Sequence, residues 1–375
     1  MPDNSPGTEK EIQSTNTITT GSTNADDAKI PPETPAEDPK ESEPTQAPSI
    51  LSTTKTPVSL TVCTLALVGA AGSWLIAGYF VQSLQQIYPS PTVMAYFSIA
   101  SLQLYFVFIS VPPPFPAIDD TESVVDHDVS DVYTNRETAK IALYLFLPLA
   151  AAFTLIIKGL TLFPQSSYCG GMALQSALAL LLFVIPGVVE ESLTRFKLAA
   201  VSLITVAGLL TVSEPALLDP AAWTGYASIG YLLLLAGILL LTLVWCLVAR
   251  FCEHTNIQKP LIFAFIGLLW MLSGWTVFIP LHLFGVEPLQ AFPPDARVYW
   301  YLLLICLLGA CVPVYLIGWT LSRTSVLFVG VGLGAIVPLH WVSEAIYLRQ
   351  WSWINFGAAV ISIAGIVLIN TRYVT

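Results

Sequence analysis

Charged residues are scarce in this chain, and the common catalytic motifs are absent. Asp, Glu, Lys and Arg make up 11% of its 375 residues, whereas a typical soluble domain has about 25%. The sequence contains no G-x-S-x-G elbow, no H-E-x-x-H pair and no Walker loop. These motifs would supply a hydrolase nucleophile, a catalytic zinc site or an ATP site. We therefore expect neither an enzyme nor an ATP-driven pump, and no cofactor.

Cysteine is also uncommon, and its spacing excludes the usual cysteine chemistry. The six cysteines form no C-x-x-C pair and no Cys/His pattern typical of a metal site. Five of them lie within apolar runs and the sixth, Cys252, follows one. We interpret them as small packing residues, and the sequence predicts no metal site.

The acidic residues that are present are concentrated in two segments. Residues 1–55 carry ten acids and four lysines, and Asp119–Asp131 carries six acids without Lys or Arg. Because the formal net charge is −10, the rest of the chain is slightly basic, and the acidity gives no indication of a nucleic-acid partner. Residues 1–55 are also rich in Ser, Thr and Pro and poor in large apolar residues. They are predicted to be a disordered tail.

Long apolar runs dominate the remainder. Apolar residues make up 55% of the chain and the mean hydropathy is +0.71, which indicates a multi-pass protein in a lipid bilayer. About 20 apolar residues form a helix that crosses the hydrocarbon core. The sequence predicts an all-α protein with ten transmembrane helices: Val58–Gln82, Thr92–Ser110, Ile141–Phe163, Ser166–Val189, Phe196–Val212, Ala227–Ala249, Leu261–Phe284, Tyr299–Leu321, Ser325–Leu348 and Trp353–Asn370.

The distribution of Lys and Arg predicts the orientation. With ten spans, one side of the membrane would carry nine of these residues near the helix ends and the other side only Arg297 and Arg349. Since cytosolic loops are enriched in Lys and Arg, both termini are expected in the cytosol.

A weak internal repeat predicts the domain organisation. An offset of 157 residues carries Ser167–Val189 and Leu198–Val212 onto the ninth and tenth runs, with Ala207-Gly208 over Ala364-Gly365. The sequence thus predicts two five-helix repeats, residues 56–213 and 214–375. Because five crossings are an odd number, the second repeat would be inverted relative to the first. Inverted repeats are common in secondary transporters, whose substrate sites lie between the halves.

Three ionisable residues inside the apolar runs are candidates for a functional role. Lys158 is well inside the third run, where a cation costs about 2.5–3.5 kcal/mol on the insertion scale. It either faces a wet cavity or snorkels to the nearby membrane surface. His340 and Glu344 share one helix face in the ninth run. They are either a proton-coupling or substrate-contacting pair, or a structural contact at the interface. Together with Tyr315 in the eighth run, these three are the predicted substrate-binding residues.

Another set of residues is predicted to serve structure or gating. Glu191 lies in the cytosolic connection after the fourth run, where a solvated anchor of helix ends is the alternative. Pro313 and Pro338 interrupt the eighth and ninth runs, as in broken helices that line a cavity. The glycines at 330, 332 and 334 follow no strand, so they favour close helix packing or a thin-walled site over phosphate binding.

The chain resembles the solute carrier 35 family, subfamily F, with its fungal vacuolar-membrane and thiamine-repressible relatives, within the drug/metabolite transporter superfamily of EamA-type fold. The resemblance covers roughly residues 58–370 and rests on several short stretches: Glu137-Thr138-Ala139-Lys140, Glu191-Ser192-Leu193-Thr194 with Lys197, Val206-Ala207-Gly208, Gly285-Val286-Glu287-Pro288, and Thr324-Ser325-Val326-Leu327 followed by Pro338. It implies that Glu191 and Glu344 occupy acidic positions of the family. The chain departs from the family pattern at Lys158 and at Pro164-Gln165-Ser166.

These observations favour a secondary transporter that moves a small polar metabolite by alternating access, driven by a proton gradient or by exchange. Lys158 would pair with an anionic cargo and Glu344 with a cationic one. The resemblance implies a vacuolar or other endomembrane location. The alternative is a non-transporting scaffold or receptor that recruits partners through its acidic tail. The oligomeric state is left open.

Overall fold

The structure of the chain is a computed structural model. It describes residues 60–109, 127–185, 191–218, 226–253, 259–284, 295–349 and 351–372. These residues are all-helical, and none of them forms a strand. The predicted disordered tail, residues 1–55, lies outside the described residues, and so does the first part of the acidic segment Asp119–Asp131.

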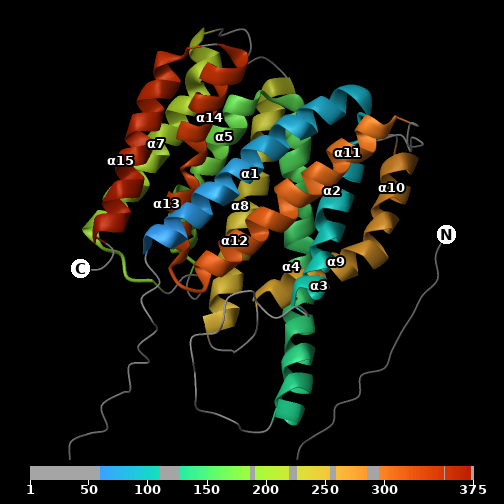
Figure 1. Cartoon of the computed structure of the whole chain (residues 1–375). Coiled ribbons are helices and arrows are strands. Elements are labelled where there is room, and N and C mark those ends of the chain that lie inside the picture. The colour runs from blue at the N-terminus through green and yellow to red at the C-terminus, as the bar shows by residue number, and fades with distance from the viewer. Residues whose placement is uncertain are drawn as a thin grey trace, which may run out of the picture. The chain divides into compact units, whose positions relative to one another are not determined.

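The helices follow one another along the chain with short interruptions (Figure 1). Four of the elements are not α-helical: η1 and η3 are 3₁₀ turns, and η4 and η5 are π-helical. The elements are α1 (Leu60–Ile87), α2 (Pro91–Ala100), η1 (Ser101–Leu104), α3 (Tyr105–Ile109), α4 (His127–Leu162), α5 (Gln165–Ala173), α6 (Gln175–Leu182), α7 (Arg195–Leu218), α8 (Tyr226–Glu253), α9 (Lys259–Ser273), η3 (Gly274–Val277), α10 (Phe278–Leu283), α11 (Ala296–Leu304), η4 (Ile305–Cys311), α12 (Val312–Leu321), α13 (Val326–Leu333), α14 (Ile336–Ser343), η5 (Glu344–Leu348) and α15 (Trp353–Arg372).

Eight segments of the described chain are long and apolar enough to cross a membrane. The second and fourth predicted runs are not among them, because each forms only shorter helices within the described residues. The second run forms a shorter apolar helix, Pro91–Val107, that contains the 3₁₀ turn η1. The fourth is divided at Leu174 into α5 and α6. The spans are Leu60–Ile87, Arg136–Leu162, Arg195–Pro215, Ser228–Phe251, Pro260–Pro280, Ala296–Leu321, Val326–Tyr347 and Trp353–Thr371.

The helix α4 is longer than its membrane crossing requires. It has 36 residues and therefore a length of about 54 Å at 1.5 Å per residue, whereas the hydrocarbon core is about 30 Å thick. Its N-terminal part, residues 127–135, precedes the span Arg136–Leu162 and belongs to the acidic, polar stretch of the sequence. In Figure 1 this part projects beyond the neighbouring helices.

The span Val326–Tyr347 lies at the centre of the bundle. In its most apolar stretch 72% of the residues are buried, against 33% for Trp353–Thr371. It contains the Gly330, Gly332 and Gly334 ridge. A Cβ at Gly330 would lie 2.9 Å from the Ser176 Cα, so α13 approaches α6 backbone to backbone. The packing interpretation of these glycines is therefore confirmed.

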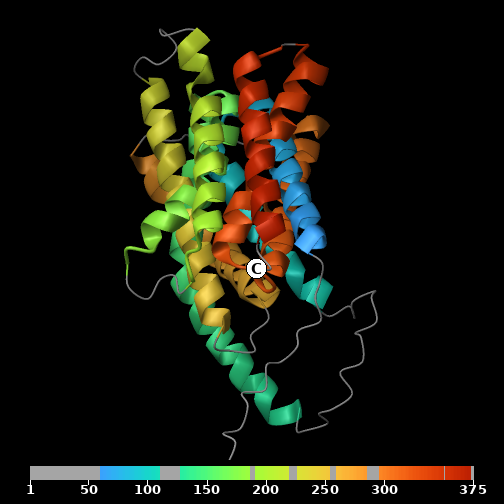
Figure 2. The same cartoon turned by 90° about the vertical axis from the view of Figure 1, so that its left-hand side faces the viewer.

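Helices that are distant in sequence lie side by side. The helix α7 packs along α15, as Figure 2 shows, and α4 packs along α8. The helix α1 packs against α12 and η4, and α2 packs against α9. The core is consequently built from contacts between the two halves of the sequence as well as within them.

Candidate functional site

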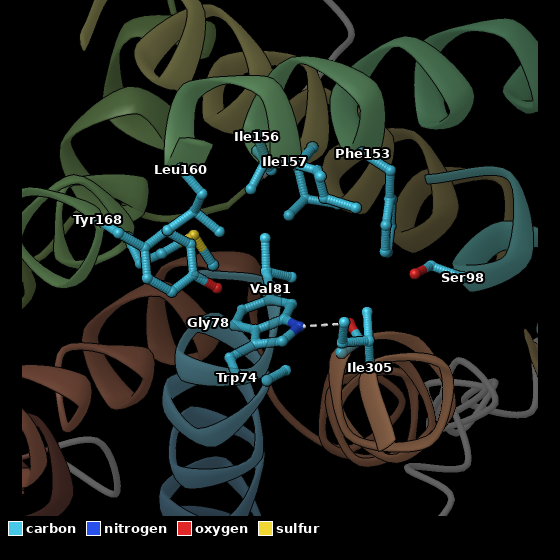
Figure 3. Close-up of a pocket in the computed structure, with 14 residues that line it drawn as sticks. Trp74, Gly78, Val81, Ser98, Phe153, Ile156, Ile157, Leu160, Tyr168 and Ile305 are labelled. Atoms are coloured by element: carbon cyan, nitrogen blue, oxygen red, sulfur yellow. Dashed lines mark hydrogen bonds between the residues drawn. The ribbon is translucent and has the colours of Figure 1, made fainter. Parts of the chain in front are cut away.

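A small cavity lies where helices from both halves of the chain meet (Figure 3). Trp74 and Gly78 of α1, Phe153 of α4, Tyr168 of α5 and Ile305 of η4 are among the residues that line it. A volume of about 40 Å³ is open to water-sized molecules, which is room for a few waters. In this conformation the cavity is too small for a metabolite.

The cavity wall is uncharged. Among the described residues that line it there is no Asp, Glu, Lys, Arg or His. Its polar groups are the Ser98 hydroxyl, the Trp74 indole N–H and the Tyr168 hydroxyl, which points into the cavity in Figure 3. Ser98 Oγ donates to the Met94 carbonyl (2.8 Å). For the Tyr168 hydroxyl, the described part of the chain provides no hydrogen-bond partner. Tyr168 therefore offers a donor and an acceptor to a molecule in the cavity.

Pro313 explains how one wall of the cavity is held. A proline cannot donate the α-helical hydrogen bond to the carbonyl four residues earlier, which here is Gly309. The Trp74 Nε1 of α1 donates to this carbonyl at 2.9 Å (Figure 3). The sequence-predicted break in the eighth run thus provides the acceptor that joins η4 to α1 beside the cavity.

Pro338 has the same local consequence in the central span. The carbonyl four residues earlier is Gly334, and Ser362 Oγ of α15 donates to it at 2.8 Å. The backbone also turns tightly there, since the Val337 N–H donates to the same carbonyl at 3.0 Å. The break between α13 and α14 is therefore anchored to α15.

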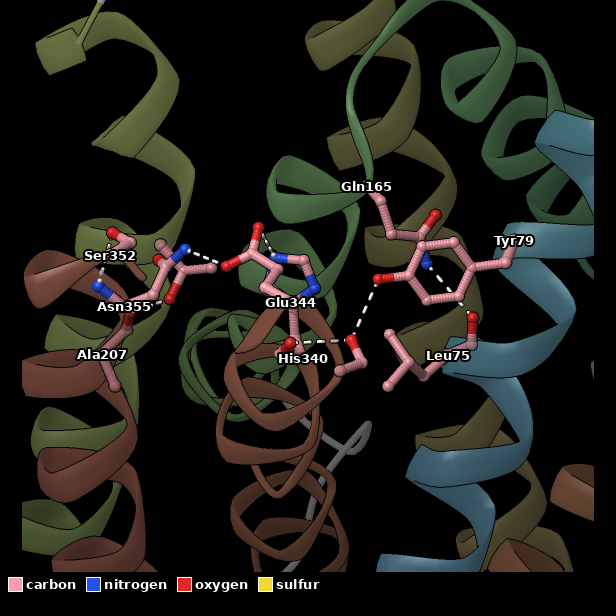
Figure 4. A network of polar contacts seen from close by, with 10 residues as sticks. Leu75, Tyr79, Gln165, Ala207, His340, Glu344, Ser352 and Asn355 are labelled. Atoms are coloured by element: carbon pink, nitrogen blue, oxygen red, sulfur yellow. Dashed lines mark hydrogen bonds and ion pairs between the residues drawn. The ribbon is translucent and has the colours of Figure 1, made fainter. Parts of the chain in front are cut away.

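A polar cluster lies at the C-terminal end of the central span Val326–Tyr347 (Figure 4). His340 is buried, with 1% of its surface exposed, and its Nε2 lies 3.2 Å from Glu344 Oε1. This distance defines an ion pair when the imidazole is protonated. The Cys169 thiol of α5 is a further side-chain partner of the imidazole. Glu344 Oε2 accepts a hydrogen bond from Asn355 Nδ2 of α15 at 2.8 Å.

The cluster continues to α1 through two hydroxyl groups. Ser343 Oγ donates to the His340 carbonyl at 2.7 Å, so the 2.9 Å contact between Tyr79 Oη and Ser343 Oγ has Tyr79 as its donor. Figure 4 shows Tyr79, His340, Glu344 and Asn355 in one row across three helices. Tyr79 follows Gly78, which lines the cavity.

Glu214 also belongs to this cluster, although the sequence reasoning did not select it. Glu214 is 8% exposed. It faces the Ser352 hydroxyl and lies within electrostatic range of Glu344 and His340. The apolar run was expected to end at Val212, but α7 continues through Pro215 to Leu218. An acid directly before a proline at the end of an apolar run was the signal that could have identified it.

Glu191 joins the connection after α6 to the beginning of the central span. Its Oε1 accepts from Lys197 Nζ at 2.7 Å, and its Oε2 lies 3.5 Å from the backbone N of Leu327 in the first turn of α13. Ser325 Oγ caps the same turn by accepting from the Phe328 N–H at 3.2 Å. A carboxylate is favourable at a helix N-terminus because free N–H groups and the helix dipole are positive there.

Neither Lys158 nor Tyr315 lies in the cavity wall or in the polar cluster around His340. Lys158 of α4 is half-buried, and in the described part of the chain no carboxylate pairs with it. Tyr315 of α12 is 46% exposed and its ring lies 6.3 Å from that of Tyr105. None of the four predicted substrate-binding residues lines the cavity, so their contact with a substrate stays a prediction.

Comparison with known proteins supports a family relationship. No protein-family model matches the chain. Solute carrier family 35 member F5 from Macaca fascicularis, from Pongo abelii and from Mus musculus is 26% identical to this chain over 179 residues, which is 47% of its length. The aligned stretch covers 40% of the Macaca protein and 33% of each of the other two.

A solved structure described as "Crystal structure of protein" is similar in fold. It aligns with 84% of this chain and 97% of its own, with a TM-score of 0.58 at 14% identity. This likeness concerns the fold alone. The sequence similarity supports a relationship of this multi-pass chain to the solute carrier 35 family, and through that family to the drug/metabolite transporter superfamily.

Proposed function

We propose that the chain is a secondary transporter that carries a small organic solute by alternating access. The observation that carries this proposal is the cavity between α1, α4, α5, α8 and η4, which is enclosed by helices from both halves of the sequence. Its small volume corresponds to a closed conformation. Rocking of the two halves would open it to one side of the membrane at a time.

The helix contacts support a two-repeat organisation. If the interrupted second and fourth segments are counted, ten helical segments result. The first packs against the eighth (α1 with α12) and the sixth against the third (α8 with α4). The second and seventh pack against each other (α2 with α9), as do the fifth and tenth (α7 with α15). Exchanging the two five-helix halves leaves this pattern unchanged. We propose that the halves are inverted repeats. Both termini would lie on the cytosolic side of an endomembrane, such as the vacuolar membrane.

The cavity wall restricts the cargo class. Aromatic and aliphatic side chains form most of it, with Ser98 and Tyr168 as its hydroxyl groups. The cargo would accordingly be a small metabolite whose apolar or aromatic body lies in the cavity and whose few polar groups meet these hydroxyls. Lys158 and Glu344 remain the proposed counter-ions for a charged group when the cavity is open.

The test is uptake or exchange by the purified protein in liposomes, with nucleotide sugars, thiamine derivatives and amino acids as cargo. Ala77 lines the cavity, and Ala77→Leu is expected to remove the activity by filling it. Ala151 is exposed on the same bundle, so Ala151→Leu adds the same volume outside the cavity and is expected to retain activity. Equal loss in both variants, or no movement of any compound by folded wild-type protein, would contradict the proposal.

The alternative is a membrane scaffold or receptor that transports nothing. The 40 Å³ cavity favours it, because a permanently closed bundle would also leave room for only a few waters. Cysteine introduced at Ala77 discriminates between the two functions. A transporter exposes this position to a water-soluble thiol reagent from at least one side during its cycle, whereas a closed scaffold protects it from both.

A further inference from the structure

The polar cluster of α7, α14 and η5 holds more acidic groups than permanent positive charges. Glu214 and Glu344 are its carboxyl groups and His340 is its basic group. No Lys or Arg of the described residues pairs with any of the three. Two other titratable side chains face the cluster, Tyr79 from α1 and Cys169 from α5. The helix α15 contributes Asn355, which is uncharged.

Burial makes the net charge of this cluster costly. An uncompensated charge in a low-dielectric interior costs several kcal/mol, so such groups pair or change protonation. One proton on His340 and a charge on Glu344 give a neutral ion pair at 3.2 Å. The Glu214 carboxyl is then the remaining group. It is neutral with a proton and leaves a net charge of −1 without one.

One buried acceptor in the cluster has no hydrogen-bond partner among the described residues. Asn355 is 1% exposed and its Oδ1 has no hydrogen-bond partner in the described part of the chain. His340, also 1% exposed, has Glu344 and the Cys169 thiol as its side-chain partners. Unpaired buried polar atoms are rare and need a specific explanation. A free acceptor in a cluster that holds two carboxyl groups can receive a hydrogen bond from a protonated acid.

We propose that Glu214 is the proton-binding group of this transporter, with the His340–Glu344 pair as its neutral surroundings. The step is the addition of one proton from water to the Glu214 carboxylate, and its later release to water on the other side. The proposal rests on the proposed function, because it names the ion that would be coupled to cargo movement.

The connection to the cavity passes through α1. Tyr79 hydrogen-bonds to Ser343 in the cluster, while Trp74 and Gly78 on the same helix line the cavity. A change of charge at Glu214 alters the field at Glu344 and His340, and through Ser343 the contact of α14 with α1. This gives a direct path from the proton to the cavity wall without requiring that both ligands share one site.

The test is infrared difference spectroscopy of the full chain in lipid bilayers, between alkaline and acidic buffers without cargo. Protonation of a buried carboxylate produces a carboxylic-acid C=O band. This band is expected in the wild type and is lost in Glu214→Gln, which imitates the protonated acid. Glu214→Asp is expected to keep the band at a shifted frequency. Glu137→Gln, at an exposed carboxylate, is the matched control and is expected to retain it.

Three outcomes overturn the proposal. The first is a band that persists in Glu214→Gln and disappears in Glu344→Gln, which assigns the proton to Glu344. The second is a wild type without any band. The third is loss of the band on adding Na⁺ at constant pH, which indicates a cation site. None of these readings depends on cargo, so failure of uptake in liposomes and failure of proton binding are distinguishable.

Discussion

The two ends of the central span Val326–Tyr347 each hold a carboxylate of similar exposure, with partners of different kinds. The Glu191 side chain is 11% exposed and pairs with Lys197. The Glu344 side chain is 13% exposed and pairs with His340. Lys carries its charge without a neighbouring acid, whereas an imidazole is an ion-pair partner only when both of its nitrogens are protonated. The first contact is therefore permanent in charge, and the second depends on protonation.

The surroundings of the two contacts differ as well. The residues that follow Glu191, 192–196, are exposed, so water and salt reach that contact. Glu344 belongs to a cluster in which His340 and Asn355 are almost fully buried. We propose that the first end can separate and re-form beside water, as a gate requires. The other end can change state only by moving a proton or a partner.

The largest predicted effect comes from breaking the buried pair. His340→Phe leaves Glu344 without its basic partner, and removal of one member of a buried pair costs about 3–5 kcal/mol. We expect a decrease of about 3 kcal/mol in the free energy of unfolding, near the lower limit because Glu344 retains its bond to Asn355. Equilibrium unfolding in mixed micelles, followed by tryptophan fluorescence, measures it.

The control for this prediction is an ion pair between two exposed side chains. Lys140 and Glu137 lie 2.6 Å apart with about half of each side chain exposed. Glu137→Gln is expected to change the stability by at most about 0.5 kcal/mol. A His340→Phe variant as stable as Glu137→Gln would show that the buried pair does not hold the second end together.

Much of the helix content was predictable, because apolar runs of about 20 residues have few alternatives in a bilayer. The positions of the breaks were predictable in part. Pro313 and Pro338 mark two of them, since the missing N–H is visible in the sequence. The division at Leu174 carries no proline signal, and Gly170 and Gly171, which precede it by about one turn, do not by themselves predict a break.

The candidate site was predictable to a smaller extent. The i, i+4 spacing of His340 and Glu344 predicted that they share a helix face, and the structure places them 3.2 Å apart. Glu214 lies 126 residues before His340 in the sequence, so no local pattern could join them. Tyr79 and Tyr168 resemble any aromatic residue in an apolar run, and only the packing distinguishes them.

The next effect concerns the first end of the span. Glu191→Ala removes the partner of Lys197 and the carboxylate at the first turn of α13, which together stabilise by about 1–2 kcal/mol. We expect this loss of stability at low salt and a smaller one at about 1 M salt, where the Debye length is about 3 Å. The salt dependence of unfolding in micelles measures the difference.

The comparison becomes sharper when His340→Phe is measured in the same salt series. Its penalty is expected to stay constant, because His340 and Asn355 are almost fully buried, whereas the Glu191 contact adjoins the exposed residues 192–196. Equal salt dependence of the two variants would mean that the two ends are equally accessible to solvent, and the distinction between a water-accessible contact and a buried cluster would fail.

The smallest effect tests how firmly the cluster is joined to α1. Tyr79→Phe removes one hydrogen bond, and Ser343 keeps its donation to the His340 carbonyl. Because no buried donor loses its partner, we expect a loss of only about 0.5–1 kcal/mol. The effect on transport is expected to exceed the effect on stability, since this hydroxyl hydrogen-bonds α14 to α1, the helix that carries Trp74 and Gly78 of the cavity wall. In liposomes Tyr79→Phe should therefore reduce proton-driven uptake more than exchange at equal pH, whereas a purely structural role would reduce both by the same factor.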